Sequence, residues 1–367
     1  MNVCMDARLL MAGGIGRYIR EIVSRALLDP RISQVTLLGS KDVVAGWLSG
    51  RDPRDIGSVV HWGGGPYSLT SHLSWPFVSP RVSAPDVWFF PHYDVPMMSM
   101  PSPLVVTVHD VIQFRHPTGF PGWKRFLGMA LLRSAVLHAS SVVTVSHASA
   151  NALAQVVPEV GRRMHVVPNG VSSKFAPLAP GEEMPSSFAD MPPFLLTVGA
   201  PTAHKNLIVA LEVLARLERS VPDLRLCMVG FDRHEAGELN EQARRLGITD
   251  RVLHLGRVTD AELHELYLRS SVFLSPSTTE GFGLPALEAF ACGAQVVVSD
   301  IPAYREILPQ ETLRVEPLNV ARWAESVRHV LQGGGEGPGR PVADESSSWD
   351  QSAEGTLRLL LDAARVQ

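Results

Sequence analysis

Short apolar runs alternate with longer amphipathic segments from one end of the chain to the other. Short continuous apolar runs are typical of parallel strands buried on both faces, and the amphipathic segments between them are typical of helices that cover such a sheet. The pattern therefore predicts an α/β fold with doubly wound parallel sheets. The runs that we expect to form strands are 3–6, 35–39, 87–90, 104–109, 142–145, 165–167, 194–199, 224–230, 252–255, 272–274 and 295–299.

The predicted strands form two series, which are separated by a proline-rich segment without a clear period, residues 176–193. A chain of 367 residues is also long for one hydrophobic core. We therefore predict an N-terminal domain over residues 1–185 and a C-terminal domain over residues 186–348. A last amphipathic helix is expected over residues 349–367, because its apolar residues recur at helical spacing.

Composition narrows the class of protein. Three cysteines, Cys4, Cys227 and Cys292, are an odd number without close pairs, which argues against a disulfide framework or a zinc site. The first strand follows Met1 directly, which leaves no room for a signal peptide, and no apolar run approaches the length of a membrane-spanning helix. We therefore expect a globular cytoplasmic protein.

The net charge of −4 hides an asymmetry between the two halves of the chain. Residues 1–180 carry 16 lysines and arginines against 10 aspartates and glutamates, whereas residues 181–367 carry 17 against 27. A basic half beside an acidic half does not indicate a nucleic-acid-binding protein. The basic half fits an anionic acceptor or a bilayer surface, although a random drift of surface charge explains it nearly as well.

The strongest functional signal is a pair of glutamates, Glu280 and Glu288, in the segment EGFGLPALEAFACG between two predicted strands. Gly281 and Gly283 leave backbone N–H groups open beside a helix N-terminus, which favours phosphate or hydroxyl oxygens. Glu280 can accept hydrogen bonds from a sugar ring and Glu288 from both hydroxyls of a ribose. An ordinary loop followed by a solvated helix face explains the isolated Glu-x7-Glu spacing equally well.

Other candidates follow the ends of predicted strands, where ligands of doubly wound sheets bind. Gly14 and Gly16 follow the first strand, His109 and Asp110 end the fourth, and Lys205 follows the first strand of the second series. A tight turn, a strand-end histidine and a surface lysine are the ordinary explanations of these residues. The chain contains no Asp-x-Asp motif, so we expect no metal or other cofactor. The charge of a bound diphosphate would then be neutralised by side chains and helix N-termini, and Lys205 is the candidate side chain.

Taken together, these motifs resemble the family 4 retaining glycosyltransferases, and the resemblance covers nearly the whole chain. The family implies the GT-B fold, in which two Rossmann-like domains face each other across an interdomain cleft, and it implies that the C-terminal helix packs back on the N-terminal domain. The segments that carry the resemblance, in chain order, are MDARLLMAGGIGRY, FFPHYDVP, VTVHDVIQF, VTVSHASANAL, VVPNGVSSKF, LLTVGAPTAHKN, LCMVG, VLHLGRVTD and ELYLRSSVFLSPSTTEGFGLP.

The resemblance also implies roles for individual residues. His109, with Asp110 fixing its ring or the loop, and Glu280 belong to the site of the transferred sugar. The donor phosphates are assigned to the glycine turn and to a cationic residue, although His204 stands where the family often has a second cation. The residues implied to bind the donor are Gly14, Gly16, Lys205, Asn206, Arg257, Val258, Gly281, Phe282, Gly283, Leu284 and Glu288.

The predicted function is therefore the transfer of a hexosyl group from a nucleotide diphosphate sugar to an acceptor hydroxyl, with retention of configuration. The resemblance is strongest to mannosyl- and rhamnosyltransferases of bacterial surface polysaccharide assembly, which favours GDP-mannose over UDP-glucose or UDP-N-acetylglucosamine. A sugar-nucleotide epimerase and an inactive sugar-nucleotide-binding subunit are the alternatives.

The acceptor is expected to be a glycan or a lipid-linked glycan. Residues 120–133 combine aromatic, aliphatic and cationic side chains on a predicted helix. Such a helix suits peripheral contact with the inner face of a membrane, or half-burial against the sheet.

Overall fold

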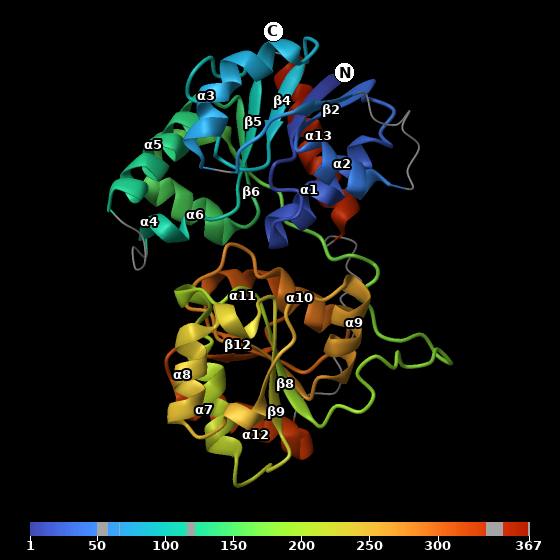
Figure 1. Ribbon diagram of the computed structural model, residues 1–367, viewed down its shortest axis with the longest axis vertical. Helices are drawn as coiled ribbons and strands as arrows, with labels where there is room; N and C mark the ends of the chain where they lie inside the picture. Colours follow the sequence, from blue (N-terminus) through green and yellow to red (C-terminus); the bar gives the residue numbers. More distant parts are fainter. Residues whose placement is uncertain (50–57, 66, 116–121, 335–347, 366–367) are drawn as a thin grey trace. The chain divides into compact units, whose positions relative to one another are not determined.

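A computed structural model of the protein describes residues 1–49, 58–65, 67–115, 122–334 and 348–365, and the chain divides into two compact units. Unit 1 contains Met1–Gly170 and Glu345–Gln367, and unit 2 contains Val171–Asp344. Each unit is built around its own parallel sheet with helices on both faces (Figure 1). The predicted α/β class and the two doubly wound sheets are confirmed.

The sheet of unit 1 has the strand order β3-β2-β1-β4-β5-β6-β7 among the described residues, with every neighbouring pair parallel. Its central strands are rich in apolar residues and buried on both faces, as in β4, where all four residues are buried. The strands are β1 Asn2–Asp6, β2 Gln34–Gly39, β3 Ser58–His61, β4 Val87–Phe90, β5 Leu104–Val108, β6 Ser141–Thr144 and β7 Met164–Val166. The α-helices are α1 Gly13–Ala26, α2 Lys41–Leu48, α3 Leu69–Val78, α4 Ile112–Arg115, α5 Gly122–His138, α6 His147–Val156 and α13 Trp349–Arg365.

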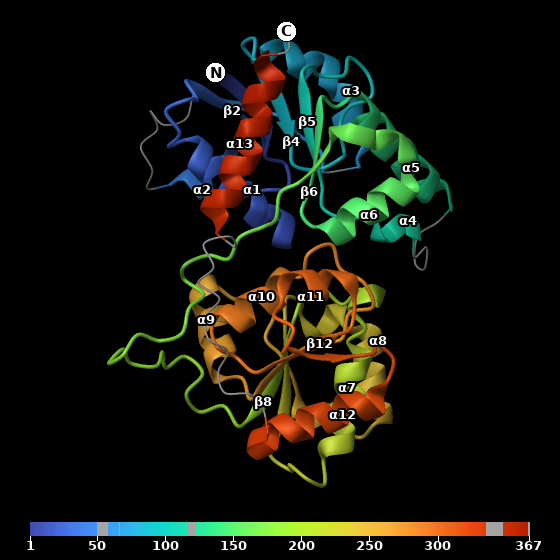
Figure 2. The same ribbon diagram turned by 180° about the vertical axis from the view of Figure 1, so that it is seen from behind.

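The C-terminal helix α13 belongs to unit 1, although it follows unit 2 in the sequence. It lies beside α1 across the face of the sheet formed by β4, β5 and β6 (Figure 2). The Tyr18 hydroxyl, from α1, lies 3.4 Å from Thr356 Oγ1 and 3.1 Å from Thr107 Oγ1, which links the helix to the sheet. Residues from the two ends of the chain therefore share one core.

The sheet of unit 2 has the order β10-β9-β8-β11-β12-β13 and is also parallel. Its strands are β8 Phe194–Val198, β9 Arg225–Val229, β10 Val252–His254, β11 Val272–Ser275, β12 Val296–Ser299 and β13 Leu313–Val315. Its α-helices are α7 Ile208–Leu217, α8 Gly237–Arg245, α9 Asp260–Arg269, α10 Leu284–Ala291, α11 Pro302–Ile307 and α12 Val320–His329. Short 3-10 turns, η4 Ala203–Lys205 and η5 Arg233–Glu235, precede α7 and α8.

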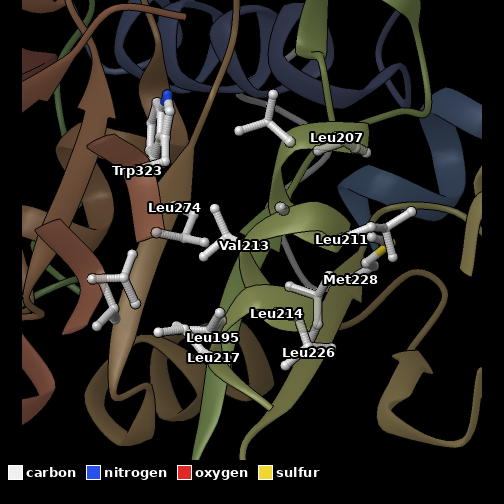
Figure 3. Packing of buried hydrophobic residues seen from close by; sticks show 14 of the residues in the cluster. Leu195, Leu207, Leu211, Val213, Leu214, Leu217, Leu226, Met228, Leu274 and Trp323 are labelled. Carbon is white, nitrogen blue, oxygen red and sulfur yellow. The ribbon is translucent and has the colours of Figure 1, made fainter. Parts of the chain in front are cut away.

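The core of unit 2 forms where the apolar stripe of α7 packs on the sheet. Figure 3 shows Val213 and Leu214 of this helix close to Leu195 and Leu274 of the two central strands. Trp323, from α12, is fully buried in the same core. Because both central strands are held in this way, the loops at their carboxyl ends start from fixed positions.

The boundary between the units differs from the prediction of residue 185. The segment 171–193 packs on unit 2, because it satisfies a buried carboxylate there. Ser187 N and Phe188 N donate to the two oxygens of Glu265, whose side chain is almost fully buried, at 3.1 and 2.9 Å. The segment 171–193 has the composition of a linker, but its backbone supplies the hydrogen-bond donors that the buried Glu265 carboxylate requires.

Two edge strands were missing from the predicted strands. The edge strands β3 and β13 are short and partly exposed, so neither has the continuous apolar run of a central strand. Helix α3 contains Pro76 and carries exposed apolar residues, and both features hide a helical period. Trp62, which precedes α3, and Trp75, which lies within it, are fully buried in the core of unit 1.

Candidate functional site

The two central strands of unit 2, β8 and β11, are neighbours in space but are separated in sequence by β9 and β10. Ligands of such sheets bind outside the carboxyl ends of the strands at this reversal of strand order. Lys205 follows β8 and Glu280 follows β11, and Lys205 Nζ lies 2.7 Å from Glu280 Oε1. The structure therefore brings these two predicted residues together at the expected edge of the sheet.

Glu280 is held by several donors at one of its two oxygens. Besides Lys205, the hydroxyls of Ser277 and Tyr304 donate to Oε1 at 2.7 and 3.3 Å. The side chain is only 8% exposed. Burial acts to raise the pKa of Glu280, but the charge and hydrogen bond of Lys205 and the bond from Ser277 outweigh it, so its pKa lies below the ordinary value. Glu280 is therefore an ionised acceptor at neutral pH.

Lys205 is positioned by its neighbours in the chain. Its aliphatic stem passes over Gly199, where an added Cβ would lie 3.2 Å from Lys205 Cε. The next residue, Asn206, has a left-handed backbone and donates both amide hydrogens, to Pro276 O and Pro317 O at 3.0 Å each. Asn206 therefore fixes the turn that carries Lys205, and its side-chain amide is already occupied.

In the loop from Gly281 to Leu284 the side chains pack toward the core. Phe282 and Leu284 are buried, so their side chains pack inward. Gly283 has a φ of 98°, and an added Cβ there would collide with the ring of Tyr304. The loop leads directly into α10, whose N-cap, Gly283, makes no side-chain capping bond. Backbone N–H groups at such a terminus suit phosphate oxygens.

Glu288 lies on the buried face of α10 and is 3% exposed. Its Oε2 accepts a hydrogen bond of 3.1 Å from Tyr267 Oη, on helix α9. Each glutamate of the motif thus accepts a hydrogen bond from a buried tyrosine, Glu280 from Tyr304 and Glu288 from Tyr267.

Arg257 and Val258 lie away from the Lys205–Glu280 pair. They follow β10, which β9 separates from β8, so two strand spacings of about 5 Å each lie between the two loops. Arg257 is exposed, and Gly256 before it has a φ of 63°.

The described residues of unit 2 include one group with the spacing of a metal site, formed by Asp232, His234 and Glu235. All three are exposed, and Asp232 and Glu235 form a capping box for η5. Their hydrogen bonds to the backbone account for the positions of both carboxylates.

In unit 1 the predicted histidine, His109, is half-buried and directly follows β5. His109 Nε2 donates to Pro91 O at 3.0 Å, and the ring packs edge-on against Tyr18 with 4.9 Å between centroids. Burial lowers the pKa of His109 to about 4, so the imidazole is neutral at pH 7. Because Nε2 carries the proton, Nδ1 has a free lone pair and can accept a hydrogen bond from a hydroxyl.

The other predicted residues of unit 1 shape the backbone. Asp110 Oδ1 accepts from Ile112 N at 3.1 Å, which fixes the turn after β5. Gly14 is exposed with open space around it. Gly16 is buried, and an added Cβ would lie 2.6 Å from Leu10 O, so only glycine permits this approach of helix and loop.

A buried polar cluster that was not predicted from the sequence lies at the carboxyl ends of β1 and β4. Asp94 is its centre, with Arg8 Nη1 3.2 Å from Oδ2 and His72 Nε2 2.8 Å from Oδ1. Tyr67 N also donates to Asp94 Oδ2 at 2.8 Å, and His92 lies beside them. Polar residues that directly follow β4, in PHYD, were the available signal, because this is the reversal point of the unit 1 sheet.

Comparisons with known proteins agree with this architecture. The family description "Glycosyltransferase Family 4" matches residues 12–175, and "Glycosyl transferases group 1" matches residues 182–341. Among solved structures, a sucrose-phosphate synthase of Thermosynechococcus elongatus superimposes with a TM-score of 0.80 over 100% of both chains. Its 17% sequence identity supports a statement about the fold alone.

Two curated relatives align with parts of the chain. An O-antigen chain mannosyltransferase of Salmonella typhimurium is 28% identical over 66% of this chain and 64% of its own length. The GDP-mannose:cellobiosyl-diphosphopolyprenol alpha-mannosyltransferase of Xanthomonas campestris is 29% identical over 58% of this chain and 54% of its own. The chain thus matches less than two thirds of each relative.

Two Rossmann-like units with these loop motifs define the class of GT-B proteins. Within that class, the chain belongs to glycosyltransferase family 4, because the two family descriptions together match most of its length.

Proposed function

We propose that this protein transfers a hexosyl group, with mannose as the first choice, from a nucleotide diphosphate sugar to an acceptor hydroxyl. The observation that carries the proposal is the buried ion pair of Lys205 and Glu280 at the reversal point of the unit 2 sheet. It sets a cation for a diphosphate beside an ionised acceptor for sugar hydroxyls. The mannosyltransferase relatives support mannose, and one of them is named for GDP-mannose.

The proposed roles divide the donor among the residues of unit 2. Lys205 and the N–H groups at the start of α10 meet the diphosphate, Glu280 meets the transferred sugar and Glu288 meets the ribose. Helix termini and a lysine stabilise the departing diphosphate as its negative charge grows. We propose that this arrangement works without a divalent ion. Chelation with EDTA should then leave the transfer rate unchanged.

Retention of configuration is part of the proposal. The bond from the anomeric carbon to the phosphate oxygen breaks, the acceptor oxygen bonds to the same face of that carbon, and the acceptor proton passes to the departing phosphate. This route needs no enzyme nucleophile. His109 of unit 1, as a neutral imidazole, offers Nδ1 to a hydroxyl of the transferred sugar.

Calorimetry with GDP-mannose, UDP-glucose and UDP-N-acetylglucosamine tests the proposal. We expect one of these donors to bind, and Glu288→Ala to weaken that binding tenfold or more, because a charge-assisted hydrogen bond contributes about 1.5–3 kcal/mol. Rapid formation of an isomeric nucleotide sugar without acceptor would instead indicate the epimerase. Donor binding without any transfer to bacterial lipid-linked glycans would indicate the inactive binding subunit.

We also propose that unit 1 contacts a membrane through α5. Trp123 and Phe126 on this helix are 66% and 78% exposed, and Lys124 Nζ lies 5.6 Å from the Trp123 ring centre. Residues 120 and 121 of the predicted segment lie outside the described residues. Aromatic residues beside cations suit the interface of an anionic bilayer. In the described part of the chain, none of the helices has the length and apolar character needed to cross a membrane.

Sedimentation with vesicles tests this contact. The double variant Trp123→Ser, Phe126→Ser should lose binding to vesicles that contain anionic lipid. The matched control is Phe77→Ser on α3, which removes an equally exposed aromatic residue of the same unit, 72% exposed. Equal sedimentation of all three proteins would exclude α5 as the contact.

A further inference from the structure

Tyr304 reaches the site from α11, which follows β12. It is almost fully buried, and its hydroxyl donates to Glu280 Oε1 at 3.3 Å. The same hydroxyl makes a close hydrogen bond with Ser275 Oγ. Because a carboxylate only accepts, the phenol proton is used on Glu280, and Ser275 must be the donor to Tyr304. A directed chain of hydrogen bonds therefore runs from Ser275 through Tyr304 to Glu280.

The donors that reach Glu280 all converge on one oxygen. Lys205 Nζ, Ser277 Oγ and Tyr304 Oη each contact Oε1. Among the described residues, no side-chain donor makes such a bond to Oε2 of Glu280. A carboxylate held at one oxygen presents the other in a fixed direction, with capacity for two further hydrogen bonds. The geometry thus leaves Oε2 for hydroxyl groups of a ligand.

The Tyr304 ring has a second contact in the same loop. It lies against Gly283, where an added Cβ would meet Cε1 of the ring. Gly283 is the N-cap of α10 and the turn through which the chain enters this helix. One buried side chain therefore supports both the carboxylate of Glu280 and the backbone beside it.

Glu288 has a corresponding partner on another helix. Tyr267, from α9, is fully buried, and its hydroxyl donates to Glu288 Oε2 at 3.1 Å. Its ring is fixed edge-on against Phe175 and Phe273, with 5.7 Å between centroids in each case. The two tyrosines come from opposite neighbours of α10 in the chain, so each glutamate is held independently.

We propose that Tyr304 and Tyr267 are positioning residues that divide recognition of the donor between its two ends. Tyr304 aims Glu280 at the hydroxyls of the transferred sugar, and Tyr267 aims Glu288 at the hydroxyls of the ribose. This inference rests on the proposed function. It predicts that removing one phenol hydroxyl affects only the ligand portion that the corresponding glutamate contacts.

Calorimetry with GDP-mannose and with GDP alone separates the two roles, with UDP-glucose and UDP as the pair if the uridine donor binds better. Tyr304→Phe should weaken GDP-mannose binding about tenfold and leave GDP binding unchanged, because GDP lacks the sugar that Glu280 contacts. Tyr267→Phe should weaken the binding of both ligands by the same factor. The two variants are matched, since each removes one buried phenol oxygen.

Ser275→Ala serves as the second variant, since it frees the Tyr304 hydroxyl without touching Glu280. Ser275→Ala should also weaken GDP-mannose binding without changing GDP binding, by a smaller factor than Tyr304→Phe. It keeps the inference testable if Tyr304→Phe does not fold. An equal effect of Tyr304→Phe and Ser275→Ala on GDP and GDP-mannose, or no effect on either, would overturn the inference. Failure of the unaltered protein to bind any nucleotide sugar would overturn the proposed function instead, so the two failures are distinguishable.

Discussion

Tyr67 and His92 share a hydrogen bond of 2.8 Å between the phenol oxygen and Nε2 of the imidazole. His92 Nδ1 accepts from Asp94 N at 3.1 Å, so the ring proton must lie on Nε2, and the Tyr67 oxygen accepts it. Tyr67 has a φ of 58°, a backbone conformation that residues other than glycine rarely adopt. The imidazole thus anchors a loop at the carboxyl ends of the unit 1 strands, and it does so only in its neutral form.

The first prediction concerns pH. Burial, followed by the charge of His109, lowers the pKa of His92 to about 3. The unfolded chain takes up a proton on this histidine near pH 6.5, whereas the folded protein does not. The stability that the neutral His92 contributes is therefore complete above pH 6.5 and decreases as the pH falls. His92→Asn retains an acceptor for Asp94 N but cannot titrate. We expect the free energy of unfolding, measured with urea between pH 4.5 and 6, to rise with pH less steeply in this variant. The difference should be about 1.4 kcal/mol per pH unit.

The control for this measurement is His61→Asn, which replaces an exposed histidine at the end of β3. The control variant should retain the slope of the unaltered protein. Equal slopes for all three proteins would show that His92 is not held neutral by its surroundings.

The second prediction concerns Asp94, which is 1% exposed and contacts Arg8, His72 and the Tyr67 backbone. Asp94→Asn leaves the buried Arg8 guanidinium with less compensating charge. The free energy of unfolding at pH 7 should fall by about 3 kcal/mol, as measured by urea denaturation. Asp300→Asn is the matched control, because it breaks an exposed ion pair with Arg305 that solvent screens. Similar losses in the two variants would contradict the central role of Asp94.

The third prediction separates the charge of Lys205 from its structural effect. Lys205→Met keeps the length of the side chain but leaves Glu280 buried without its cation, so both stability and affinity for GDP should fall. Adding Glu280→Gln should restore the melting temperature but not the GDP affinity, which calorimetry should show about tenfold below that of the unaltered protein. Lys174→Met, at an exposed position of the same unit, should change neither quantity. Recovery of GDP binding in the double variant would show that Lys205 acts only by neutralising Glu280.

The fourth prediction uses two glycines with similar backbones. Gly283 and Gly247 have φ angles of 98° and 72°, but only Gly283 lies against another side chain, the ring of Tyr304. Gly247→Ala should therefore cost only the strain of a left-handed alanine, about 1–2 kcal/mol. Gly283→Ala should cost clearly more in thermal denaturation, and it should also weaken nucleotide-sugar binding, which Gly247→Ala leaves intact. Equal costs would mean that the Tyr304 ring moves aside freely.

The sequence by itself determined the class of fold and the residues at the centre of the unit 2 site. The central strands are buried on both faces, so their apolar runs are easily found, whereas the short strands β3 and β13 lack a continuous apolar run. Lys205 and Glu280 were predictable because each directly follows a central strand, and the carboxyl ends of parallel strands lie at one edge of the sheet.

Only the tertiary structure decided which side chains meet. Lys205 and Glu280 are 75 positions apart, and their 2.7 Å contact depends on the pairing of β8 with β11, which skips two intervening strands. Tyr304 and Tyr267 carry no local mark of function in the sequence. They gain their roles because helices α11 and α9 bring one phenol hydroxyl to each glutamate, and hydrogen bonds act only over distances that the packed core sets.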